Sequence, residues 1–231
     1  MGESDNNDGG TDDSPVSLTA AEQRNASPER MLFFSDGVFA IIITILVLDL
    51  KVPELDSGVA LSDSLTDMRP SFIAFVLSFL LVGMYWVEHR GMFTQIRYVD
   101  ANVLWLNLVF LLPLSMVPFA ASALGKYESN PTALHLYGAV LMAATLMRLI
   151  LVSYLQRHPG LSWVSSTKQA NRLMTVVGIA PMVVYGAAML VASWQPWLSV
   201  ALYLSMPLLY FGAIAFLKTD PRTRVDAEDL A

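Results

Sequence analysis

Three residues at the start of a long apolar run could carry polar chemistry inside a membrane: Arg30, Ser35 and Asp36, with Phe34 directly before the last two. The run continues almost without interruption to Leu50. About 20 apolar residues are enough for a helix to cross a bilayer. An ionised Asp near the centre of such a helix costs about 2.5–3.5 kcal/mol. We therefore expect Asp36 to be paired with another polar group and to serve a function.

The composition predicts an all-α integral membrane protein. The chain has 231 residues, of which 55% are hydrophobic and 15% are charged, whereas about 25% of the residues of a soluble domain are charged. The absence of cysteine excludes disulfides and thiolate metal sites. The three histidines lie in separate segments without metal-ligand spacing, and we find no catalytic set and no nucleotide motif. We expect neither an enzyme nor a resident cofactor, and no nucleic-acid partner.

Six apolar stretches are long enough to span a membrane. They are Arg30–Val52, Ser71–Glu88, Val99–Leu124, Ala133–Leu155, Leu173–Trp194 and Trp197–Leu217. We find no internal repeat, so residues 27–218 are expected to form a single unit of six helices. Residues 1–26 are polar and acidic and are predicted to be a disordered cytoplasmic segment, and residues 219–231 form a predicted cytoplasmic tail.

The distribution of Lys and Arg predicts the orientation of the bundle. With six spans, most of the 14 basic residues flank the two termini or the second and fourth loops. Only Lys51, Arg69 and Lys126 lie on the opposite side, and Arg148 lies within the fourth span. The positive-inside rule then places both termini in the cytoplasm, and we expect a multi-pass protein of the plasma membrane.

The helical period separates two faces of the first span. Ile41, Thr44, Ile45 and Leu48 share one face, because a helix turns by about 100° per residue. Asp36 lies five residues before Ile41, which places it about 140° around the helix from that face. The Ile41 face either lines a pathway or simply faces lipid or other helices, and periodicity alone does not separate these readings.

The partners of the two intramembrane charges are only partly predictable. His89 and Asn107, on the second and third spans, are candidate partners of Asp36, and so is an arginine of a neighbouring helix. Arg148 either extends its guanidinium towards the membrane surface or pairs with a buried acid.

The residues from Arg30 to Asp36 fit Arg-x-x-x-Phe-Ser-Asp, and in this they resemble the first-helix signature of the transmembrane protein 175 family. The segment Trp86-x-x-His89-x-x-x-Phe93 and residues 107–118 are similar to the second and third spans of that family. The likeness extends from residue 27 to about 218. It implies a six-span potassium channel with a single repeat and no re-entrant filter loop.

The resemblance also implies roles for individual residues. Ile41 corresponds to the narrowest point of a pore lined by the first helix, and Thr44 and Leu48 correspond to the next pore-facing layers. Arg30, Ser35 and Asp36 correspond to a hydrogen-bonded network that holds this helix. Family members with one repeat assemble as homotetramers, so we expect four chains around one axis, K⁺ as the permeant ion, and other monovalent cations or H⁺ as candidates.

Three functions remain open from the sequence. The first is a passive cation channel with a hydrophobic gate. The second is a proton-coupled secondary transporter that uses Asp36 as its proton site. The third is a non-conducting membrane scaffold, which would not need an intramembrane Asp.

Overall fold

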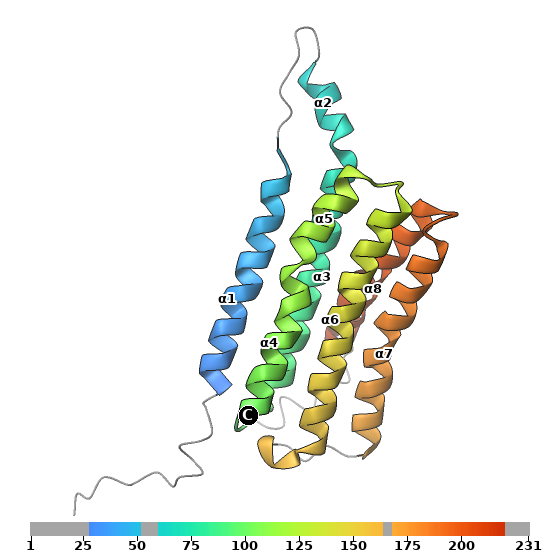
Figure 1. The fold of residues 1–231 in the computed structure, drawn as a ribbon. Helices are drawn as coiled ribbons and strands as arrows, with labels where there is room; N and C mark the ends of the chain where they lie inside the picture. The colour runs from blue at the N-terminus through green and yellow to red at the C-terminus, as the bar shows by residue number, and fades with distance from the viewer. Residues whose placement is uncertain (1–27, 52–59, 164–167, 220–231) are drawn as a thin grey trace, which may run out of the picture.

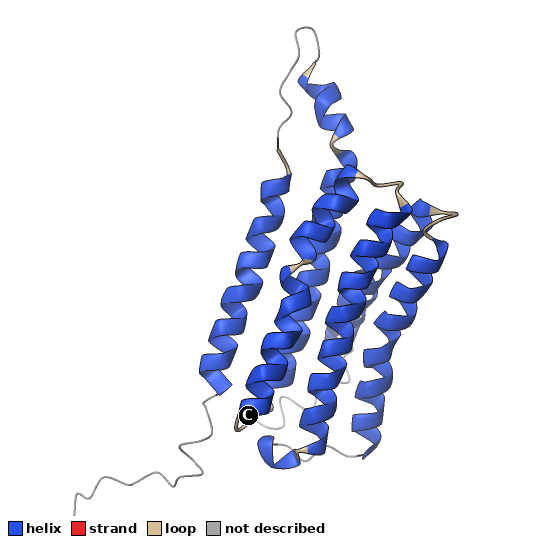
Figure 2. Ribbon diagram, viewed as in Figure 1, coloured by secondary structure: helices blue, strands red, loops and turns tan. Residues whose placement is uncertain are grey.

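Helices account for nearly all of the structure (Figures 1 and 2). The computed structural model describes the backbone of residues 28–51, 60–163 and 168–219, and in the last range the side chains of residues 178–212. The predicted N-terminal segment and nearly all of the predicted tail lie outside the described residues. The prediction of an all-α protein is confirmed for the part of the chain that is described.

The elements follow one another in an up-and-down order. They are α1 (Pro28–Leu46), the 3-10 turn η1 (Val47–Asp49), α2 (Leu61–Asp67), α3 (Arg69–Phe93), α4 (Ala101–Ser115), α5 (Val117–Lys126), α6 (Pro131–Arg157), the 3-10 turn η2 (Pro159–Leu161), α7 (Lys168–Val191) and α8 (Pro196–Thr219). The short helix α2, between the first and second spans, was not predicted.

Four segments of the described chain are long and apolar enough to cross a membrane: Pro28–Asp49, Arg69–Phe93, Ala101–Lys126 and Pro131–Arg157. They correspond to the first four predicted spans. The described apolar parts of α7 and α8 are shorter, covering Gly178–Val191 and Pro196–Gly212.

The outer surface of the bundle is apolar, as a lipid-facing surface must be. Leu112, Phe119, Val183, Leu190 and Leu209 each expose more than half of their area. In water an exposed apolar surface spread over several helices would favour aggregation, whereas in hydrocarbon it has no such cost. The chain is therefore a multi-pass membrane protein.

The third predicted span is not one continuous helix. It is divided at Met116 into α4 and α5. Pro118 has no N–H, so the carbonyl of Leu114 loses its usual partner four residues later. At the same point the N–H of Met116 donates to the carbonyl of Pro113 at 3.1 Å, in the i to i−3 pattern of a tighter turn. The two prolines thus explain the break.

The first helix lies at the edge of the bundle, with one side uncovered (Figure 1). Its inner side contacts α3, α4 and α5. The α-helix ends at Leu46, and η1 continues the segment to Asp49. Leu48, predicted to be a layer of the same helical face, therefore lies in a 3-10 turn.

Two loops close the end of the bundle at which α1 begins (Figure 1). The N–H of Arg97 donates to the carbonyl of Leu161 at 2.7 Å, and that of Trp163 donates to the carbonyl of Gln95 at 2.9 Å. The guanidinium of Arg97 lies over the ring of Trp163, 4.6 Å from its centroid. These contacts join the α3–α4 connection to the segment after α6.

Candidate functional site

The inner face of α1 is fixed by apolar packing. Met31, Phe39, Ile42 and Leu46 are buried and recur every three to eight residues, as the helical period requires. Phe39 packs against the ring of Phe110 on α4, with 6.4 Å between ring centroids. This face holds α1 against the bundle and leaves one polar residue, Ser35, buried among apolar neighbours.

A buried hydrogen-bond chain connects α1 to α3 through α4. The side-chain amide of Asn107 donates to Ser35 Oγ at 2.9 Å, and Ser35 donates to the carbonyl of Met31 at 2.9 Å. Asn107 Oδ1 lies 2.7 Å from His89 Nε2. Because the amide oxygen can only accept, His89 Nε2 is the donor. Every link of the chain thus has a donor and an acceptor.

Aromatic rings surround His89 and set its orientation. The imidazole stacks on Phe110 with 5.7 Å between centroids and an interplanar angle of 7°. Phe93, one helical turn further along α3, lies 4.7 Å away, and Phe39 of α1 lies 5.6 Å away. The ring is only 1% exposed. Its packing and its bond to Asn107 together fix the position of α1 relative to α3.

Asp36 is held by a separate pair of residues on α3. Trp86 Nε1 donates to Asp36 Oδ1 at 2.7 Å, and Arg90 lies 3.8 Å from the other carboxylate oxygen. Arg90 is 60% exposed at its side chain, so the indole bond is the stronger constraint. The candidates His89 and Asn107 do not bond to Asp36: Asn107 donates to Ser35, and His89 donates to Asn107. The arginine of a neighbouring helix was the alternative that the structure supports.

Sequence reasoning did not assign a role to Trp86 or Arg90. The available signal was their spacing: Trp86, His89 and Arg90 occupy positions i, i+3 and i+4 of α3 and so share one face. Asp36 of α1 meets that face through Trp86 and Arg90, and Ser35 is connected to it through Asn107 and His89.

The outer face of α1 is exposed and mainly apolar. Ile41 is 59% exposed, Ile45 42% and Leu48 66%, and Thr44 is also exposed. Ile42, one residue after Ile41, is 3% exposed. The helical-period prediction that the Ile41 face and Asp36 point in different directions agrees with these positions.

The hydroxyl of Thr44 is already used within its own helix. Its Oγ1 donates to the carbonyls of Ala40 and Ile41, each at 3.0 Å. The hydroxyl proton is therefore directed at the backbone, and the oxygen lone pairs remain for a group outside the helix. A cation would meet an acceptor at this position.

The other two motif residues do not join these contacts within one chain. Arg30 is exposed and has no ion pair with the residues that the structure describes, and Phe34 is 54% exposed. Phe34 lies seven residues before Ile41, which places it on the outer face. Of the four motif residues, the structure brings Ser35 and Asp36 to α3 and α4 and leaves Arg30 and Phe34 outside.

Comparison with known proteins gives one consistent family. The sequence model described as "Endosomal/lysosomal potassium channel TMEM175" matches residues 30–118. A potassium channel of Chryseobacterium sp. (strain P1-3) is 34% identical over 185 residues, covering 78% of this chain and 91% of that protein. A potassium channel of Streptomyces collinus is 41% identical over 111 residues, covering 48% of this chain and 54% of that protein.

The fold has a solved relative as well. The crystal structure of a lysosomal potassium-selective channel TMEM175 homolog from Chamaesiphon minutus superposes with a TM-score of 0.68 at 28% identity, covering 79% of this chain and 95% of that one. The fold and the site define an all-α, multi-pass membrane protein whose first helix has one fixed and one open face. The chain belongs to the TMEM175 family, which is a family of ion channels and not of enzymes.

We predict that Asn107→Ala destabilises the protein by about 1–3 kcal/mol, because it leaves the buried Nε2–H of His89 without an acceptor and removes the donor to Ser35. The matched control is Asn102→Ala on the same helix, which removes an exposed bond to Tyr154 and should stay within about 0.5 kcal/mol. Thermal unfolding in detergent measures both variants. Equal unfolding temperatures for the two variants would show that the buried chain does not hold α1.

Proposed function

We propose that this chain forms a potassium channel in which the first helices of four subunits surround one axis. The observation that carries the proposal is the asymmetry of α1. One face is fixed by Ser35, Asp36 and apolar packing, and the opposite face, centred on Ile41, is exposed. A single chain leaves that face without protein contacts, whereas four copies would enclose it. The family and its curated potassium-channel members support K⁺ as the ion.

Selection in this proposal occurs at an apolar neck formed by four copies of Ile41. A narrow apolar ring excludes liquid water and so acts as a gate by dewetting. An ion that enters it must shed part of its hydration shell, which is harder for Na⁺ than for K⁺ because Na⁺ holds water more tightly. Leu48 forms a second apolar layer, and the Thr44 oxygens between the two layers replace some of the lost water. Ile45 lines the pore beside them.

Six membrane spans fit this arrangement. Helices α7 and α8 contain 24 residues each, or about 36 Å at 1.5 Å per residue, which exceeds a hydrocarbon core of about 30 Å. With six spans both termini lie on one side, and the positive-inside rule makes that side the cytoplasm. We propose the plasma membrane as the location.

Arg30 and Phe34 fit contacts between subunits better than contacts within one. Both lie on exposed positions of α1 at the end where the helix begins. In a tetramer this end faces the neighbouring subunits, so a guanidinium and an aromatic ring there would join the motif network across the interface.

The contacts of Asp36 argue against a proton-coupled transporter. A carboxylate that carries protons must be free to reach a transport pathway, whereas Asp36 accepts a 2.7 Å bond from the indole of Trp86 and lies 3.8 Å from Arg90. Both contacts hold the carboxylate against α3. Asp36 therefore serves to hold the helix in this proposal.

Flux through purified protein in liposomes separates the three candidate functions. With a K⁺ gradient and a proton ionophore, a channel gives fast, voltage-driven K⁺ flux. Slow, saturable flux coupled to protons would instead indicate a transporter, and no flux would indicate a scaffold. We expect the first result, together with weaker permeation by Na⁺.

We predict that Ile41→Asn raises the resting leak and moves the K⁺/Na⁺ permeability ratio towards one, because four amides hydrate the neck. The control is Ile73→Asn, which puts the same substitution at an apolar position of α3 that is 50% exposed. Reversal potentials under mixed K⁺ and Na⁺ gradients measure the ratio. An unchanged ratio and leak in Ile41→Asn would mean that Ile41 is not the constriction.

A further inference from the structure

A partly open cavity of about 660 Å³ lies between α3, α4, α6, α7 and α8. Its wall is mainly apolar, and the loop residues Gln95, Pro159 and Ser162 line its end nearest the start of α1. The apolar lining includes Val87, Met92, Phe110, Val152, Leu155 and Tyr210. A volume of this size is typical of sites for small organic molecules. None of the outer-face residues of α1 lines it, so it is separate from the proposed pore.

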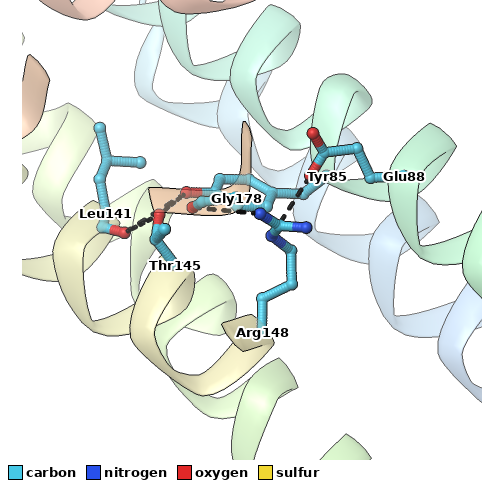
Figure 3. Close-up of polar contacts among 6 residues, drawn as sticks. All are labelled: Tyr85, Glu88, Leu141, Thr145, Arg148 and Gly178. Atoms are coloured by element: carbon cyan, nitrogen blue, oxygen red, sulfur yellow. Dashed lines mark hydrogen bonds and ion pairs between the residues drawn. The ribbon is translucent and has the colours of Figure 1, made fainter. Parts of the chain in front are cut away.

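The polar side of the cavity is formed by a partly buried ion pair between Arg148 and Glu88 (Figure 3). Arg148 Nε lies 3.4 Å from Glu88 Oε2, and the two side chains are 14% and 19% exposed. An Nη atom of Arg148 donates to the carbonyl of Gly178 at 3.3 Å. Arg148 Nε itself has no hydrogen-bond partner among the described residues. Of the two alternatives for Arg148, the ion pair with Glu88 supports pairing with an acid rather than extension to the membrane surface.

His89 adds a hydrogen-bond acceptor to the same wall. Its Nε2 is a donor to Asn107, so the neutral ring leaves Nδ1 with a lone pair. That atom is buried, and no described residue bonds to it. The described wall therefore offers a cationic donor, Arg148, and an acceptor, Glu88, and it includes His89, whose Nδ1 is an unpartnered acceptor.

Among the described residues of this wall the charges of Glu88 and Arg148 sum to zero, which limits the ligands that fit. A charged head group would add an uncompensated charge in a poorly hydrated site, or would have to separate Glu88 from Arg148. A neutral head that both donates and accepts hydrogen bonds satisfies the unpaired atoms without that cost. We propose that the cavity binds a neutral, single-chain amphiphile with such a head, an amide being the closest match, and an apolar tail against Val152 and Leu155.

Occupancy of the cavity is coupled to the first helix through α3. Glu88, at the cavity, lies within two residues of Trp86 and Arg90, which hold Asp36. It is also adjacent in sequence to His89, which bonds to Asn107, the partner of Ser35. A ligand that bonds to Glu88 and His89 therefore acts on the turn that fixes α1. The proposal that binding changes the K⁺ flux rests on the proposed channel function. The proposal of the binding site does not.

The test uses three probes with the same eight-carbon length and different head charges: octanamide, octanoate and octylammonium. Calorimetric titration into full-length protein in nanodiscs measures the affinity of each probe. We expect octanamide to bind most tightly and Val152→Trp, which fills the cavity, to weaken it about tenfold or more. Ile150→Trp, at a 41% exposed position of the same helix, should bind as the unmodified chain does. Val152→Phe is the milder filling variant if the Trp variant does not fold.

Tighter binding of octanoate or octylammonium would overturn the neutral head group. Equal binding of octanamide to the Val152 and Ile150 variants would overturn the cavity as the site, since it would reflect partition into lipid. Flux measured on the same samples keeps the two proposals apart. Protein that binds octanamide with the expected pattern but conducts no K⁺ refutes the channel and leaves the site, and binding without any change in flux refutes only the coupling.

Discussion

A single buried amide fixes the rotation of the first helix, and the remainder of the proposed pore depends on that rotation. Asn107 bonds on one side to Ser35 of α1 and on the other to His89 of α3. All three residues are at most 2% exposed, so a turn of α1 about its axis would leave polar atoms unpaired in an apolar environment. The free energy of each such loss is about 1–3 kcal/mol. The fixed face in turn determines which residues of α1 point outward.

The conspicuous charge of the motif is thus part of the support, and plain apolar residues carry the proposed selectivity. Asp36 is paired with an indole and an arginine, whereas Ile41 makes up the open face. This division suits a channel that has no ring of filter carbonyls, because selectivity then depends on the width and wetting of an apolar ring. In the proposed tetramer the ring would be only as narrow as the positions of its four helices allow, so the width of the ring would depend on the contacts that hold α1. The same stretch of α3 borders the cavity beside Arg148, so one segment connects the pore helix to the interior of the subunit.

The sequence predicted the features that depend on one helix at a time. Helical period separated Ile41 from Asp36, and apolar length located the spans, of which four have matching long apolar segments in the described chain. Contacts between helices were harder to predict. The choice of Trp86 rather than His89 as the donor to Asp36 depends on how α1 and α3 cross. The pairing of Arg148 with Glu88 depends on how closely α6 approaches α3. The division at Met116 arises from two prolines on neighbouring turns. The cavity arises because the helices that border it do not fill the space between them.

The most direct test of the central claim is chemical modification along α1 in the conducting protein. The chain has no cysteine, so single cysteines at Ile41, Ile42 and Leu48 report without background. A positively charged methanethiosulfonate reagent, applied during K⁺ current recording, gives the rate of block at each position. The account predicts rapid block at Ile41→Cys and Leu48→Cys and none at Ile42→Cys, whose position is 3% exposed. Block at Ile42→Cys with no effect at Ile41→Cys would contradict it, because the other face of the helix would then line the pore.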